Sequence, residues 1–143
     1  MKADNKTTTE VITVLNKLSE AYARRDLESL LAGFAPDPDV VMYGTGADEK
    51  RVGLAEIRAQ AERDWSQTEA AAIKHDTVSV SATGSVAWAA VDGAFEVKVG
   101  GQEMALPARI TYTLEKREDR WLIVQAHFSV PMAGQEEGES FPA

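Results

Sequence analysis

Residues 107–131 of the chain read PARITYTLEKREDRWLIVQAHFSVP, and this stretch decides the fold. β-Branched and aromatic residues dominate its first part, 108–116, and recur in its last part, 121–130, which favours two pleated strands. The segment between them, 117–120, is fully charged and is expected to form a turn in water. The stretch therefore predicts a β-hairpin.

Side chains alternate between the two faces of a strand, so the second strand of this hairpin has two different faces. One face mixes aromatic, apolar and polar residues, as the wall of a pocket would. Its members are Trp121, Ile123, Gln125, His127 and Ser129. The opposite face is wholly apolar and is expected to bury against another layer or a partner subunit. Its members are Leu122, Val124, Ala126, Phe128 and Val130.

The pairing of the two strands depends on the length of the turn. A three-residue turn, 118–120, sets Arg109 opposite Ser129 and Thr111 opposite His127, so that all four share the pocket face. A turn of two or four residues turns Arg109 away, because a slip of one residue moves every side chain to the other face.

His127 and Arg109 are the candidate catalytic residues of this face. A histidine titrates near neutral pH and can act as general acid or base. An arginine stays charged and can hold a carboxylate or a developing oxyanion. The alternative is structural: Arg109 stacks on an aromatic ring or pairs with an acid, and His127 is a satisfied core residue. Ser129 has no nucleophile elbow around it, which favours a hydrogen bond to backbone over nucleophilic catalysis.

The rest of the chain places helices before strands. The expected helices cover residues 8–24, a short segment capped by Asp26, and 53–67. The expected strands cover residues 40–43, 73–80, 86–99, 102–116 and 121–130. This order is typical of an α+β fold with an antiparallel sheet.

Finer expectations concern the ends and the turns. Residues 1–6 are expected to fray, and Thr7 with Glu10 fits a capping box for the first helix. Gly93 marks a bulge or bend, and Gly100-Gly101 a tight hairpin turn.

Composition excludes several classes of function. The net charge is −8, which disfavours binding to nucleic acid and to anionic membranes. The chain has no cysteine, so thiolate catalysis and zinc–thiolate sites are excluded. Its two histidines, His75 and His127, lie on different expected strands, so neither a metal site nor a cofactor is expected. A signal peptide is not apparent at residues 1–10, and a cytoplasmic location is expected.

A family resemblance follows from several motifs together. The pattern Arg109-x-Thr111, a charged turn, then Trp121-x-Ile-Val-x-x-His127-x-Ser129 resembles the C-terminal hairpin of SnoaL-like domains, which belong to the nuclear-transport-factor-2-like superfamily. The resemblance covers roughly residues 11–131. It implies a homodimer, and it agrees with the single domain at 1–132 expected from the chain length. It also implies a strongly curved, cone-shaped sheet around the helices. The acidic, glycine-containing composition of 133–143 predicts a flexible tail.

The resemblance also implies a pocket inside the cone. Its expected ligand-binding residues are Tyr22, Trp65, Trp88, Thr111, Trp121 and Ser129. Tyr22 resembles the helix-one tyrosine of ketosteroid isomerases, but the two strand acids of those enzymes have no match. Epoxide hydrolases of the superfamily carry Arg-x-Asp where this chain has Arg109-x-Thr111.

The expected function is the binding of a small, partly apolar molecule with a carbonyl or anionic group. One alternative is an isomerase, cyclase or hydrolase that uses His127 as acid or base. The other is a non-catalytic association module. Fold alone does not separate these classes.

Overall fold

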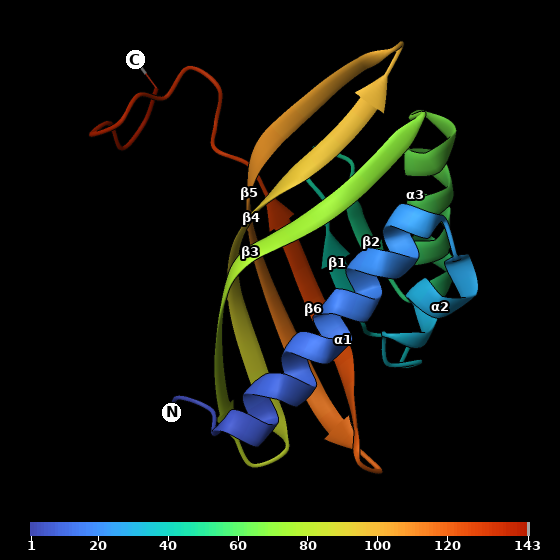
Figure 1. Ribbon diagram of the computed structural model, residues 1–143, viewed down its shortest axis with the longest axis vertical. Helices are drawn as coiled ribbons and strands as arrows, with labels where there is room; N and C mark the ends of the chain where they lie inside the picture. Colours follow the sequence, from blue (N-terminus) through green and yellow to red (C-terminus); the bar gives the residue numbers. More distant parts are fainter. Residues whose placement is uncertain (143) are drawn as a thin grey trace.

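The computed structural model describes residues 1–142, and within that range the chain forms three helices and six strands (Figure 1). The helices are α1 (Asn5–Arg24), α2 (Leu27–Ala32) and α3 (Leu54–Ser66). The strands are β1 (Val41–Tyr43), β2 (Lys50–Val52), β3 (Ala70–Thr83), β4 (Val86–Val99), β5 (Gln102–Arg117) and β6 (Arg120–Ser129). They form one sheet in the order β2-β1-β6-β5-β4-β3, and among these strands only the β1–β6 pair is parallel.

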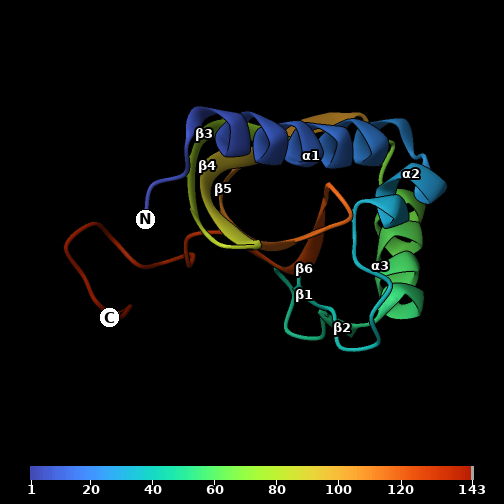
Figure 2. The same cartoon turned by 90° about the horizontal axis from the view of Figure 1, so that it is seen from below.

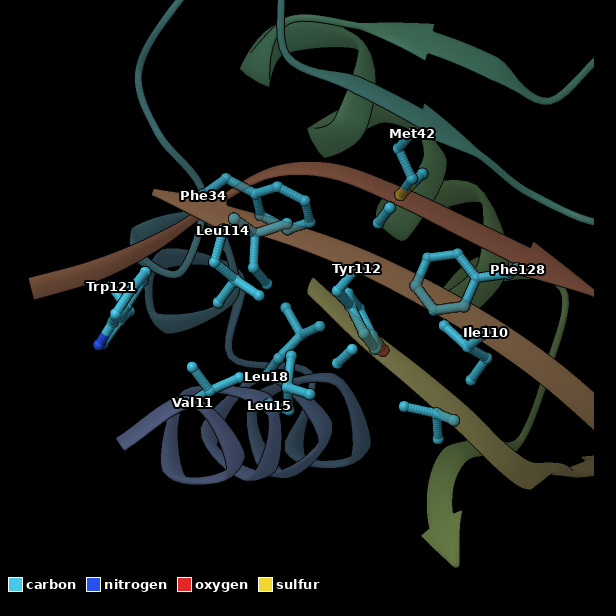
Figure 3. Packing of buried hydrophobic residues seen from close by; sticks show 14 of the residues in the cluster. Val11, Leu15, Leu18, Phe34, Met42, Ile110, Tyr112, Leu114, Trp121 and Phe128 are labelled. Carbon is cyan, nitrogen blue, oxygen red and sulfur yellow. The ribbon is translucent and has the colours of Figure 1, made fainter. Parts of the chain in front are cut away.

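The sheet curls around the helices without closing, and the predicted α+β class is confirmed (Figure 2). Helix α1 runs across the concave face, and α2 and α3 lie on the side where the sheet is open. Apolar side chains meet inside the curve (Figure 3). From α1 these are Val11, Leu15 and Leu18, and from β5 they are Ile110, Tyr112 and Leu114. The helical spacing at 11, 15 and 18 is therefore the buried stripe of α1.

The turn between β5 and β6 is shorter than predicted. It contains only Glu118 and Asp119, because Arg120 already pairs with Arg117. Both turn residues have positive φ, at 49° and 64°, as a type I′ hairpin turn requires. Of the turn lengths left open by the sequence, the structure has the two-residue one, and the three-residue alternative at 118–120 is wrong.

A bulge in β6 compensates for the shorter turn. Leu114 pairs with Ile123, but the next residue towards the start of β5, Thr113, pairs with Gln125, so Val124 has no partner of its own. An extra residue of this kind shifts the pairing by one position. Arg109 consequently pairs with Ser129. The sequence allows this pairing for a three-residue turn, whereas the structure reaches it with a two-residue turn and a bulge.

The bulge also exchanges the faces of β6 halfway along the strand. Before it, Trp121 and Ile123 are buried inside the curve. After it, Ala126 and Phe128 are the buried residues, while His127 is exposed. The apolar face predicted to run from Leu122 to Val130 is therefore not continuous, and strict alternation fails at Val124.

The N-terminal residues are ordered by pairing with β3. The backbone N–H of Ala3 donates to the carbonyl of Val80 at 3.1 Å, and the N–H of Ala82 donates to the carbonyl of Met1 at 2.9 Å. Ala3 is buried in the process. The expectation that residues 1–6 fray is wrong, because this segment extends the sheet for two residues and then enters α1.

Helix α1 begins one turn earlier than predicted. Asp4 is the N-cap, and its side chain accepts a 2.8 Å hydrogen bond from the backbone N–H of Thr7. The capping box of Thr7 and Glu10 does not form, because Glu10 accepts hydrogen bonds from Trp121 and Lys116 instead. The predicted cap of α2 is confirmed, since Asp26 accepts from the N–H of Ser29.

The two glycine predictions have different outcomes. Gly100 and Gly101 form the tight β4–β5 turn, with φ of 57° and 77°. Gly93 does not lie in a bulge of its own strand; the bulge is opposite, in β3 between His75 and Thr77. A Cβ at Gly93 would lie only 1.8 Å from the carbonyl oxygen of Lys74, so only glycine fits there.

The segment after β6 carries neither helix nor strand as far as residue 142, and its side chains are mostly exposed. The flexibility predicted for 133–143 stays a prediction, and residue 143 lies outside the described residues. Each helix within 1–142 is too short or too polar to cross a membrane.

Candidate functional site

The four polar residues predicted to line a pocket share one face of the sheet, but it is the outer face. Arg109, Thr111 and His127 are exposed, and Ser129 is half-buried. The Ser129 hydroxyl donates to the Arg109 carbonyl at 2.9 Å, and Tyr43 of β1 stacks on the His127 ring with centroids 5.1 Å apart. None of the four lines the interior cavity described below.

The facing of this group is therefore corrected, and the bulge at Val124 is the reason. Catalysis by His127 and Arg109, and ligand binding by Thr111 and Ser129, stay predictions. Any such role would act on a molecule bound to the outer face of the sheet.

The predicted aromatic residues lie in three different places. Trp121 is buried at the far end of the core, where its indole N–H donates to Oε2 of Glu10 at 2.9 Å. Trp88 is half-buried on the outer face of β4. Trp65 packs against Tyr22, with centroids 5.9 Å apart, and its indole N–H donates to the Tyr22 carbonyl at 3.1 Å. Of the predicted ligand-binding residues, only Tyr22 lines the cavity.

A cavity of about 250 Å³ lies between α1, α3 and the concave side of the sheet. Most of its wall is apolar. The apolar side chains are Leu18, Leu30, Phe34, Met42, Ile57, Ala61, Ala71, Ala72, Ile73, Phe95, Val97, Leu106 and Phe128. Four polar side chains joined by hydrogen bonds come from α1, from α3 and from the loop between β1 and β2, and Thr45, Gln67 and Thr68 also line the cavity. We call Tyr22, Glu49, Gln60 and Asp64 the polar wall.

Helix α3 supplies two members of the polar wall through its periodicity. Ile57, Gln60, Ala61 and Asp64 fall at i, i+3, i+4 and i+7, which is one face of a helix. Ile57, Gln60 and Ala61 are buried, and Asp64 is half-buried. The inward face of α3 thus carries two polar residues among apolar ones.

Asp64 accepts hydrogen bonds on both carboxylate oxygens. The hydroxyl of Tyr22 donates to Oδ2 at 2.9 Å, and the side-chain amide of Gln60 donates to Oδ1 at 2.7 Å. Both donors are neutral. Asp64 forms no ion pair with any residue in the described part of the chain.

Glu49 is the second carboxylate of the polar wall and is held differently. Its Oε1 accepts from the amide of Gln60 at 2.9 Å and from Arg63 at 2.8 Å, while Oε2 accepts from the backbone N–H of Gly46 at 2.6 Å. Gln60 is 4% exposed, and its carbonyl oxygen accepts from Nε of Arg51 at 2.8 Å. Gln60 therefore bridges the two carboxylates and has every side-chain hydrogen used.

Burial shifts the pKa values of the central pair. Burial raises the pKa of Asp64, and the hydrogen bonds from Gln60 and Tyr22 oppose that rise. Burial raises the pKa of Tyr22 far above its ordinary value, and the negative charge of Asp64 adds to the rise. Tyr22 therefore remains a neutral donor to Asp64 at any physiological pH.

A separate polar cluster lies between α1 and the sheet. His75 is within hydrogen-bond distance of Ser19 through Nδ1 (3.2 Å) and of the Tyr112 hydroxyl through Nε2 (2.9 Å). Burial lowers the pKa of His75, so the ring is neutral and one of its nitrogens accepts. The cluster satisfies buried groups and joins three elements. It does not line the cavity.

Sequence reasoning missed Asp64, Gln60 and Glu49. A signal for the first two was present, because both share the helical face of Ile57 and Ala61. For Glu49 the sequence carries no comparable signal, since its position depends on how the loop after β1 folds back onto α3. No group of three potential metal ligands gathers within residues 1–142.

Comparison with known families identifies the class of protein. The model of the SnoaL-like domain matches residues 11–133, and the chain belongs to this family. A search of curated proteins found no significant match.

Solved structures share the fold at low sequence identity. A nuclear transport factor 2-like superfamily protein from Salmonella enterica is 19% identical, with a TM-score of 0.83 over 97% of this chain and 100% of that one. A "putative dehydratase" of the NTF2-like family from Streptomyces avermitilis is 18% identical, with a TM-score of 0.82 over 91% and 100%. A protein with a cystatin-like fold from Nostoc punctiforme is 14% identical, with a TM-score of 0.74 over 93% and 97%. At these identities the likeness shows the fold alone.

Proposed function

We propose that the protein binds a small, mostly apolar molecule in the interior cavity, with the polar end of that molecule against the polar wall. The observation that carries this proposal is the composition of the cavity, which has apolar sides and one cluster of polar groups. Such an arrangement is typical of ligand sites, where apolar surface supplies affinity and a few polar groups fix orientation.

The proposal differs from the sequence-based expectation in where the ligand sits. That expectation placed a carbonyl or anionic group against Arg109 and His127. The cavity contains neither residue, and its polar groups come from α1, α3 and the β1–β2 loop. We therefore assign the ligand to Tyr22 and Asp64 rather than to the β5–β6 hairpin.

Saturation-transfer NMR with neutral aromatic fragments such as indole tests this proposal. Filling the cavity with Ala71→Phe should abolish the signal, because Ala71 is buried and lines the cavity. The matched control is Ala59→Phe, which adds the same ring on the exposed face of α3, outside the cavity wall and the proposed dimer face. If no fragment binds, or if both variants bind fragments equally well, the cavity is not the site.

A second candidate function is proton transfer inside the cavity. It is favoured by one observation: Asp64 is a carboxylate among apolar side chains, positioned by two neutral donors and without an ion-pair partner. A carboxylate in that setting is a suitable general base. It would take a proton from a bound molecule and return it to another atom of the same molecule, which amounts to isomerisation.

Deuterium exchange distinguishes this candidate from simple binding. The C–H bonds beside the carbonyl of 2-indanone should exchange in D₂O faster with the protein than with buffer, and Asp64→Asn should remove the acceleration. If 2-indanone binds but its C–H bonds exchange no faster than in buffer, proton transfer is contradicted and binding remains the function.

We also propose a homodimer that forms through the outer face of the sheet. The helices leave the outer side of the sheet uncovered (Figure 2). This outer face carries Trp88 and the stacked pair of Tyr43 and His127. Thr111→Glu places a charge in the middle of this face and should yield monomers in sedimentation. Thr83→Glu, at the exposed end of β3, is the control. A monomeric wild type at micromolar concentration would contradict the dimer.

The association module is the remaining alternative, and it predicts a dimer with an unliganded cavity. The cytoplasmic location is a proposal as well, and cell fractionation tests it.

A further inference from the structure

The polar wall of the cavity carries negative charge only. Its two ionisable carboxyl groups are Asp64 and Glu49, and no lysine, arginine or histidine lines the cavity. The side chain of Glu49 is 14% exposed, so water screens it weakly. An anionic ligand would therefore meet unfavourable charge at the polar wall, which holds every ionisable carboxyl group that lines the cavity.

The hydrogen-bond donors of the wall are already used. Both amide hydrogens of Gln60 go to the two carboxylates, and the hydroxyl hydrogen of Tyr22 goes to Asp64. What remains for a ligand are acceptor sites on the carboxylates and on the Tyr22 oxygen. A ligand group that faces this wall must donate hydrogen bonds.

The neighbouring guanidinium groups do not line the cavity and are engaged by other partners. Arg63 binds Asp48 and Glu49, and Arg51 donates to the carbonyl oxygen of Gln60. Arg25 is similarly engaged, because it donates to the backbone carbonyls of Trp65 and Thr68.

Of the two carboxylates, only Glu49 thus has a cationic partner within residues 1–142. Asp64 has neutral partners alone, which leaves its charge uncompensated in an apolar setting.

We infer that the cavity takes a small amine in its protonated form, with the ammonium group on Asp64 and Glu49 and an aromatic or alkyl body against Phe95 and Phe128. This inference rests on the proposed function and names its ligand class. An ammonium group supplies three donors and one positive charge, which match the acceptors and the unpaired charge of the wall. A cavity of about 150 Å³ holds benzene, so one of about 250 Å³ suits a ligand of roughly ten non-hydrogen atoms.

Three probes of nearly equal size separate charge from shape: 2-phenylethylamine, 2-phenylethanol and phenylacetate. Their dissociation constants are measured by calorimetry or NMR titration at neutral pH. We expect the amine to bind about tenfold more tightly than the alcohol, since a charge-assisted hydrogen bond exceeds a neutral one by about that factor. We expect phenylacetate to bind more weakly than both.

Asp64→Asn should reduce the preference for the amine over the alcohol to about one, while the alcohol still binds. The matched control is Asp48→Asn, which removes the same charge from an exposed carboxylate that lies outside the cavity wall. It should leave the preference unchanged. This pair separates the local contact from the net charge of the protein.

Two outcomes overturn the inference without affecting the proposed function. One is equal binding of the amine and the alcohol in the wild type, and the other is tighter binding of phenylacetate. The assignment to the polar wall is overturned if Asp64→Asn still binds the amine more tightly than the alcohol. It is also overturned if Asp48→Asn abolishes this preference as completely as Asp64→Asn does. If none of the three probes binds while indole still binds and Ala71→Phe removes it, the amine class is wrong and the cavity remains the site.

Discussion

Tyr22 and Asp64 lie 42 positions apart in the chain, and the hydroxyl of the first donates a 2.9 Å hydrogen bond to the carboxylate of the second. The bond joins α1 to α3 across the cavity wall. It places the Tyr22 hydroxyl, which does not ionise at physiological pH, against the carboxyl group of Asp64. Burial makes the ionisation of that carboxyl group costly. The energetics of the site therefore depend on this contact.

Tyr22→Phe should destabilise the protein by about 1–2 kcal/mol, because a hydrogen bond to a buried carboxylate is lost while the ring is kept. The pKa of Asp64 should rise further, since a donor that favours its ionised form is removed. Urea unfolding and a side-chain carboxyl NMR titration measure the two effects. Tyr43→Phe, on the outer face, is the control. An unchanged pKa of Asp64 would show that the bond does not form in solution.

The stability of the wild type relative to Asp64→Asn should fall as the pH rises. The pKa of Asp64 is raised in the folded state above its ordinary value of 3.8, so between the two values the folded state binds more protons than the unfolded state. Unfolding free energy then decreases with pH across that window and stays lower above it. Comparing the two proteins cancels the opposite contribution of carboxylates such as Asp37, whose pKa Arg117 lowers. Parallel curves from pH 4 to pH 7 would contradict the shift.

Gly93→Ala should be severely destabilising, by about 3 kcal/mol, because the added Cβ would overlap the backbone carbonyl of Lys74. Neither group can move without breaking the β3–β4 pairing. Gly33→Ala is the matched control, since its Cβ would meet neighbours at 3.5 Å or more and its φ is −76°. Denaturant unfolding of the two variants checks the difference, and similar losses would rule out a steric cause.

Asp4→Ala should lower the melting temperature by several degrees, whereas Thr7→Ala should change it little. The side chain of Asp4 caps α1 by accepting from the backbone N–H of Thr7, a hydrogen bond that Thr7→Ala keeps. Thermal unfolding monitored by circular dichroism compares the two variants. A larger effect at Thr7 would favour the capping box that the sequence suggests.

The fold could be predicted from sequence because its signals are long and periodic. The stripe of Val11, Leu15 and Leu18 and the β-branched run before residue 114 each extend over several turns or pleats. The location of the site could not be predicted, because it depends on single-residue events. A two-residue turn and the bulge at Val124 have opposite effects on the pairing of Arg109, so the structure reaches with a two-residue turn the pairing that the sequence allowed only for a three-residue turn.

The facing of the polar residues shows the limit of that reasoning. His127 and Trp121 are an even number of positions apart and were expected on one face, but one extra residue between them puts them on opposite faces. The cavity, in turn, depends on contacts between α1, α3 and a loop that lie far apart in the chain. Only the polar positions Gln60 and Asp64 on the inward face of α3 indicated it from sequence.

The pairing of residues 1–3 with β3 has a consequence for how the protein behaves in concentrated solution. β3 is one of the two edge strands of the sheet, and an unpaired edge strand is a template for intermolecular strand addition. The hydrogen bonds of Met1 and Ala3 occupy part of that edge. Deleting this short segment, or fusing a bulky affinity tag ahead of it, should expose the edge and promote aggregation. A tag placed after Ala143 avoids that risk.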